Sequence, residues 1–168
     1  MTTRTRKTKT RKTKKRVRLP NSMPALTELA VRDVIRCERQ PKKYRLDMAK
    51  WLYRPQLSKP CSVCMAGAVM AQTLGVRLPV EGTGLDPLSL GDEHARVRLY
   101  AINAIRTGDA HYAYYRLGRV PPAGWEQVEE GIRNGCVAWL GRAPWPVYLR
   151  AAKDLRRLEH AEKRNSST

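Results

Sequence analysis

The chain contains a single Cys-x-x-Cys pair, formed by Cys61 and Cys64. Two thiolates at this spacing are half of a zinc site, which then needs two more ligands at similar spacing. The remaining candidates are scattered along the chain: Cys37, Cys136, His94 and His111. Zinc binding and thiol-redox chemistry therefore stay open as alternatives, the second because a helix N-terminus near Cys61 would stabilise a thiolate. The sequence favours small thiols buried in a tightly packed helix.

Other catalytic patterns are sparse. The chain has three histidines, and none of its serines lies in a nucleophile motif. Two short groups of acids and histidines resemble metal clusters, namely Asp92, Glu93, His94 and Asp109, His111. An aspartate just before a helix is more often an N-cap, so we expect a nonenzymatic protein without a cofactor.

The strongest chemical signal is the N-terminal tail, residues 1–18, which holds ten of the 33 lysines and arginines and none of the 15 acids. Its cations are Arg4, Arg6, Lys7, Lys9, Arg11, Lys12, Lys14, Lys15, Arg16 and Arg18. A segment of this kind binds phosphates by displacing condensed counterions. Because it has no aromatic side chain to stack on bases, we expect sequence-nonspecific binding to nucleic acid. Its few apolar residues lead us to expect disorder in isolation.

A second row of cations lies in the predicted last helix, which begins near Pro146. The row consists of Arg150, Lys153, Arg157, His160 and Arg164. Spacings of three and four residues place these side chains on one helix face, where they could follow a phosphate backbone. The alternative is that they only complement the dipole at the helix C-terminus.

The rest of the chain, residues 19–168, is long enough for one domain and carries 23 cations against 15 acids, a formal net charge of +8. No run of 18 apolar residues or secretory signal is present, so we expect neither a membrane span nor export. Four cysteines without an export signal are more naturally reduced thiols, which favours a cytoplasmic protein.

The domain that positions these residues is predicted to be mainly α. We expect a compact bundle of about five to six helices. Helices are expected from near Pro24, over 62–74, after Asp92, after Asp109, around 126–133 and from Pro146. Ser22, Asp92 and Asp109 are the expected N-caps. In the first helix an apolar stripe leaves Arg32, Arg36 and Arg39 on a different face. In the second, Ala66, Gly67, Ala68 and Ala71 would allow a neighbouring element to approach closely.

Two segments are less regular. Residues 42–54 fit either a short strand or an extended turn, and residues 76–91 are predicted to be a long loop. The second helix looks like the start of a helix-turn-helix, but Pro79, Gly82 and Gly84 would break the recognition helix that should follow. We therefore do not expect sequence-specific reading of the major groove.

The segments CSVCMAGAVMA and AINAIRTGD resemble a group of small bacteriophage-encoded proteins of uncharacterised function, over about residues 40–160. The resemblance implies an intracellular protein made during infection, and supplies no catalytic residue.

Together these features predict a nonenzymatic phage protein that associates with DNA or RNA in the host cytoplasm or at the nucleoid. The alternative is a phage inhibitor or adaptor that binds a host protein, such as a defence or transcription component. Its contact surface would use aromatic side chains from this set: Tyr112, Tyr114, Tyr115, Trp125, Trp139 and Trp145.

Overall fold

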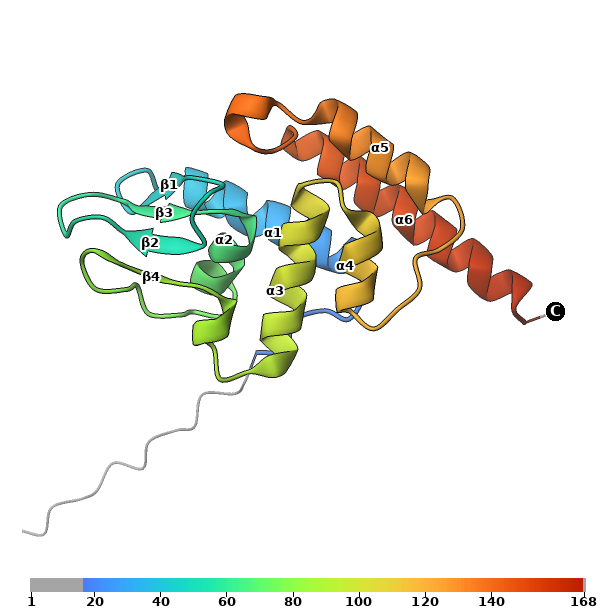
Figure 1. The fold of residues 1–168 in the computed structure, drawn as a ribbon, viewed down its shortest axis with the longest axis horizontal. Coiled ribbons are helices and arrows are strands. Elements are labelled where there is room, and N and C mark those ends of the chain that lie inside the picture. The colour runs from blue at the N-terminus through green and yellow to red at the C-terminus, as the bar shows by residue number, and fades with distance from the viewer. Residues whose placement is uncertain (1–16, 168) are drawn as a thin grey trace, which may run out of the picture.

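The computed structural model describes residues 17–167. Six α-helices dominate this part of the chain: α1 Met23–Glu38, α2 Met65–Gln72, α3 Glu93–Arg106, α4 Ala110–Arg116, α5 Trp125–Gly135 and α6 Trp145–Asn165. The predicted mainly α fold is confirmed (Figure 1). The tail prediction for residues 1–16 lies outside the described residues.

A small sheet accompanies the helices, and its strands are β1 Tyr44–Leu46, β2 Leu52–Arg54, β3 Cys61–Val63 and β4 Thr83–Leu85. The strand order is β1-β3-β2-β4, with β1 and β3 parallel and the other pairs antiparallel. Residues 42–54, which were expected to form either a short strand or an extended turn, thus contain two strands, β1 and β2. Two short 3-10 helices, η1 Pro87–Ser89 and η2 Ala138–Leu140, complete the described elements.

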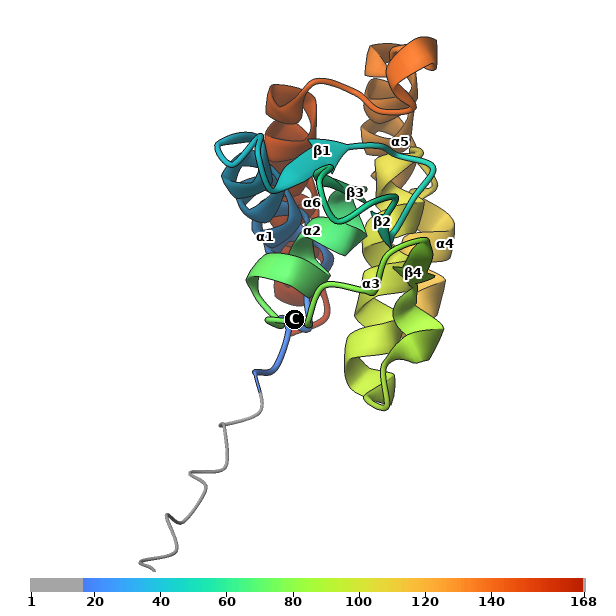
Figure 2. The ribbon, with the colours of Figure 1, turned by 90° about the vertical axis from the view of Figure 1, so that its left-hand side faces the viewer.

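The core forms where α1 and α3 meet their neighbours. Helix α1 packs on α2, α3 and α6, and α3 also packs on α2 and α4. Figure 2 shows α1 and α6 on one side of the molecule and α3 and α4 on the other. None of the helices within residues 17–167 is both long and apolar enough to span a bilayer.

Two of the expected N-caps are confirmed. The Asp92 carboxylate accepts from the amides of His94 and Ala95 at the start of α3, and Asp109 accepts from Tyr112 at the start of α4. Ser22 does occupy the N-cap position of α1, but its side chain makes no capping bond. Pro24, the second residue of this helix, lacks an amide proton, which leaves fewer amides to cap.

The small residues of α2 do admit a close neighbour, as predicted. A Cβ built on Gly67 would lie 1.3 Å from the carbonyl oxygen of Trp51, so the backbone before β2 occupies the space of the missing side chain. The expected start of this helix at Ser62 is wrong. Residues 61–63 form β3, and α2 begins at Met65.

Candidate nucleic-acid interface

The predicted row of cations on the last helix is exposed along its whole length. Arg150, Lys153, Arg157, His160 and Arg164 all lie at the surface of the continuous helix α6. At 100° per residue they fall within an arc of about 80°. This arc lies opposite the buried side chains of the same helix, which are Tyr148, Ala151, Ala152 and Leu155. We call these five residues the α6 ridge.

The charges of the ridge are only partly compensated. Arg157 approaches the carboxylate of Asp154 at 3.5 Å. Arg150 and Lys153 make no ion pair within residues 17–167. These two side chains can therefore meet an external anion without breaking an internal pair.

A second row of arginines lies beside the ridge. Helices α1 and α6 run antiparallel, because Trp145 Nε1 donates to Glu38 at 3.0 Å and Arg156 pairs with Glu28 at 2.6 Å. Arg32 and Arg36 of α1 are exposed, as is Arg39, the C-cap residue of this helix. We call these three the α1 row. The sequence placed them on one helix face, but it gave no signal that this helix would pair with α6.

Two of the α1 arginines also have a structural task. The carboxylate of Asp33 is fully buried, and Arg32 and Arg36 approach it at 3.2 and 3.3 Å. The hydroxyl of Thr73 donates to the same carboxylate. A buried carboxylate needs such partners, so Arg32 and Arg36 stabilise Asp33. Arg39 is the member of the row that makes no ion pair in the described part of the chain.

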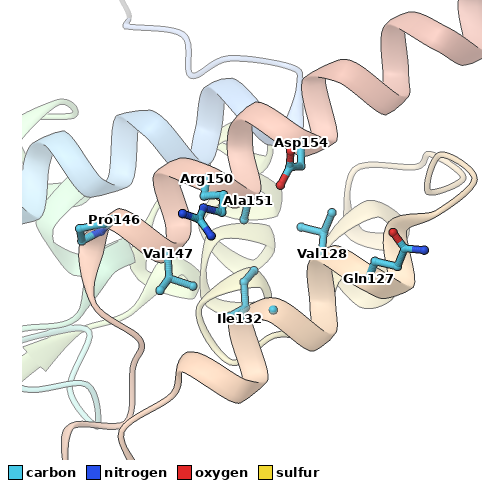
Figure 3. A pocket seen from close by; sticks show the side chains of 9 residues that line it. Gln127, Val128, Ile132, Pro146, Val147, Arg150, Ala151 and Asp154 are labelled. Atoms are coloured by element: carbon cyan, nitrogen blue, oxygen red, sulfur yellow. The ribbon is translucent and has the colours of Figure 1, made fainter.

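Between the helices lies a groove of about 440 Å³, lined by Glu28, Val31, Arg32, Ile35, Arg36, Arg39 and Leu149. Its floor is apolar, and its rim is basic except for Glu28, which Arg156 neutralises. A second groove of about 360 Å³ separates α5 from α6 (Figure 3). Arg150 and Asp154 project from α6 beside this groove, and Val128 and Ile132 face it from α5. It contains no histidine, cysteine or hydroxyl group that would act as a nucleophile.

The structure places the two motif cysteines in different elements. Cys61 lies in β3 and not at a helix start, so the geometry expected for a redox thiolate is wrong. Cys64 is the N-cap of α2, where its sulfur accepts from the Gly67 amide at 3.4 Å. Burial raises the pKa of both thiols, which disfavours the thiolate that redox chemistry and zinc binding need.

The residues considered as candidate metal ligands do not form a cluster in the described part of the chain. Across residues 17–167 no group of three or more histidine, cysteine or acidic side chains is placed to hold a metal ion. Asp92 and Asp109 serve instead as the helix caps described above. The acid and histidine groups thus have a structural explanation.

The aromatic side chains divide into core and surface. Tyr114 is buried, and its hydroxyl donates to Glu159 at 2.6 Å. Tyr112 and Tyr115 are 42% and 67% exposed, and Trp139 is 85% exposed at the tip of the η2 loop. Trp125 and Trp145 are half-buried and pack against the core.

Most of the predicted tail cations, from Arg4 to Arg16, lie outside the described residues. Arg18 is exposed, and the buried side chain of Leu19 begins the domain. The Arg98 Nε donates to the carbonyl of Pro20 at 3.0 Å, which ties the entering chain to α3. Comparisons of the chain with protein-family models, with curated proteins and with solved structures found no match.

Proposed function

We propose that this is a nonenzymatic phage protein that binds the phosphate backbone of nucleic acid in the host cytoplasm, without sequence preference. The α6 ridge, the neighbouring α1 row and the cations of the tail would make the contacts. The observation that carries the proposal is the α6 ridge, five exposed basic side chains on one face of a continuous helix.

The dimensions of the ridge support contact with a phosphate backbone. From Arg150 to Arg164 the helix rises about 21 Å, at 1.5 Å per residue. Phosphates of one strand follow each other at about 3.4 Å along a duplex axis, so the ridge spans several of them. Each phosphate neutralised by a lysine or arginine releases counterions, and this release supplies most of the nonspecific affinity.

The segment after α2 supports the proposed lack of sequence preference. A helix-turn-helix would need a recognition helix directly after it, whereas residues 73–92 contain β4 and η1 instead. The ridge itself carries only long cationic side chains and one histidine, which suit phosphates better than base edges.

A charge-matched pair of variants tests the proposal. Arg150→Gln combined with Lys153→Gln removes two ridge charges, and Lys59→Gln combined with Arg77→Gln removes two exposed charges near the sheet. We expect the ridge variant to weaken duplex binding about tenfold and to reduce the salt slope by roughly 2, since each lost phosphate contact accounts for about 0.9. The control variant should bind as the wild type does. Equal losses in the two variants would contradict a role for the ridge.

One observation favours the second candidate, a protein that binds a host protein. Trp139 is 85% exposed on a loop that the Val137–Arg142 bridge and a bond from Arg106 to the Gly141 carbonyl hold in place. Exposed tryptophans on fixed loops are typical anchors of protein interfaces. A Trp139→Ala variant should then lose host partners that the wild type retains after nuclease treatment and high salt. Identical partners for both forms would exclude this anchor.

A further inference from the structure

A band of aromatic rings and one guanidinium crosses the surface of α3 and α4. It begins at Trp51, whose ring meets Tyr100 edge-on with 5.5 Å between centroids. The guanidinium carbon of Arg116 then lies 4.7 Å from the Tyr100 ring and 5.9 Å from the Tyr112 ring. Tyr112 stacks on Tyr115 with 6.0 Å between centroids and 24° between planes. We call these five residues the aromatic band.

The outer end of the band is open to solvent. The side chains of Tyr112 and Tyr115 are 42% and 67% exposed, so their stacked rings lie at the surface and not in the core. Their neighbours Ala113 and Tyr114 point inward and hold α4 against the core. Two nearly parallel rings are therefore presented on a helix that is itself fixed.

Arg116 is held between rings, and among residues 17–167 its side chain has no hydrogen-bond or ion-pair partner. Its Nε is buried and makes no hydrogen bond, and the side chain makes no ion pair within residues 17–167. Arginine carries five N–H donors and no acceptor, so the other N–H groups of Arg116 are free to donate to an acceptor from outside the chain. A phosphate or a base edge would provide one.

Two basic side chains lie near the band, and one of them is paired with an acid. Lys50 is exposed beside Trp51, and Arg96 lies one helical turn before Tyr100 on the same face of α3. The acid Glu93 is compensated by Arg96 at 3.8 Å. The band also shares no residue with the α6 ridge, because its members belong to α3, α4 and the segment before β2.

We propose that the aromatic band binds unpaired bases of single-stranded nucleic acid. The rings of Tyr112 and Tyr115 stack on base planes, and the Arg116 guanidinium donates to a phosphate or a base edge. In a duplex the base faces are covered by their neighbours, so the band has no stacking partner there. An apolar protein surface would cover the rings but leave the Arg116 donors without acceptors, which is why a nucleotide fits better.

This inference goes beyond backbone binding, because phosphate contacts alone give no preference for single strands. It rests on different residues from the proposed function, so each can fail without the other. The α6 ridge predicts duplex binding that depends on salt. The aromatic band predicts additional affinity that appears only when bases are unpaired.

The test measures binding of the full chain to an unstructured oligonucleotide of about 30 nucleotides and to the duplex of the same sequence. Replacing both Tyr112 and Tyr115 by Ala should weaken single-strand binding at least about fivefold, the lower end for one stacked base, and leave duplex binding unchanged. The conservative pair Tyr112→Phe and Tyr115→Phe should retain single-strand binding, because stacking needs the ring and not the hydroxyl. All three forms should remain folded and unfold cooperatively in urea, since neither side chain belongs to the buried core.

Three results would overturn the inference. The Ala pair could bind single strands as tightly as the wild type, or lose single-strand and duplex binding equally, or the Phe pair could lose as much as the Ala pair. The control Trp139→Ala removes an exposed ring elsewhere and should change neither affinity. If the wild type fails to bind the duplex but the Ala pair still weakens single-strand binding, the backbone proposal fails and the band is supported.

Discussion

At the residue scale, Gly67 is the glycine at which an added methyl group would meet its neighbour most closely. Its absent Cβ is replaced by the backbone of Trp51, and a methyl group there would meet a carbonyl carbon and oxygen, neither of which can rotate away. The close crossing of α2 and the segment before β2 therefore depends on glycine at this position.

Gly67→Ala should destabilise the domain by more than about 3 kcal/mol or prevent folding, because the clash forces a backbone shift in the core. Gly131 is the matched control, since it is a helical glycine in α5 with nothing within 4 Å of the added Cβ. Gly131→Ala should raise the free energy of unfolding by up to about 1 kcal/mol through helix propensity. Urea denaturation measures both, and similar effects of the two substitutions would contradict the close crossing.

Two buried groups, a thiol and a phenol, keep their protons in the folded chain at high pH. The free energy of unfolding therefore decreases at alkaline pH. Burial raises the pKa of the Cys37 thiol from its ordinary 9.0 to about 11, and burial raises the pKa of Tyr148 to about 12. Between pH 9 and 11 the unfolded chain has lost the Cys37 proton that the folded chain still binds, so stability falls as pH rises.

The free energy of unfolding should decrease from pH 9 to 11 by up to about 1.4 kcal/mol per pH unit for this thiol. Cys37→Ala should flatten that decrease, although it lowers stability at pH 8 through lost packing. Urea denaturation at several pH values tests this. An unchanged slope in the variant would show that Cys37 does not carry the effect.

Residue roles were predictable from the sequence where the partners are close along the chain. Asp92 and Asp109 cap helices that begin one residue later, so the local pattern is sufficient. Glu129 was not predicted, because its carboxylate accepts from Ala110 across 19 residues of chain. Cys61 is expected at the N-terminus of a helix because helix-forming residues follow it, whereas pairing with distant strands makes it part of a sheet.

At the scale of elements, Glu129 joins α5 to the start of α4. Its carboxylate accepts from the amides of Ala110 at 2.8 Å and His111 at 3.4 Å, and it forms an ion pair with Arg133. Both the Glu129 side chain and Ala110 are buried, so water cannot replace the carboxylate as the acceptor of the Ala110 amide.

Glu129→Ala should lower the free energy of unfolding by about 2 kcal/mol, because two helix-end amides lose their acceptor. Arg133→Gln removes only the exposed ion-pair partner and should cost less than about 1 kcal/mol. Chemical denaturation of both variants checks the difference. A cost for Arg133→Gln equal to that of Glu129→Ala would show that the ion pair, and not the capping, matters.

The helices were predictable and the sheet largely was not. Helices α3, α4 and α6 carry apolar residues at helical spacing together with caps or prolines at their starts, which are local signals. Strand β3 is buried on both faces and shows no alternation, so it reads as part of the helix that follows. Strand β4 lies in the predicted loop 76–91 and owes its conformation to pairing with β2. The antiparallel pairing of α1 with α6, which adds the α1 row to the candidate site, is likewise a long-range feature.

At the scale of the whole molecule, the basic charge is divided between the tail and the domain. Residues 19–168 carry a formal net charge of +8 without the tail, and the ridge and the α1 row place eight basic side chains on one side. Two cationic parts joined in one chain bind a polyanion more tightly than either part alone, because the second contact becomes intramolecular.

Deleting residues 2–18 should therefore weaken duplex binding by at least about 100-fold at low salt while leaving weaker binding through the ridge. The described part of this segment contains only the exposed residues Val17 and Arg18, so the core from Leu19 onward stays complete. Fluorescence anisotropy with a labelled duplex measures the loss. Undiminished affinity after the deletion would remove the tail from the proposal.

The most direct test of the central claim is the salt dependence of duplex binding by the full chain. If about half of the ten tail cations and three domain cations engage phosphates, log affinity should fall linearly with log salt with a slope of roughly −7, at about 0.9 per phosphate. The slope should be the same for duplexes of unrelated sequence. A slope near zero, or one sequence bound far more tightly than the others, would contradict binding through the phosphate backbone.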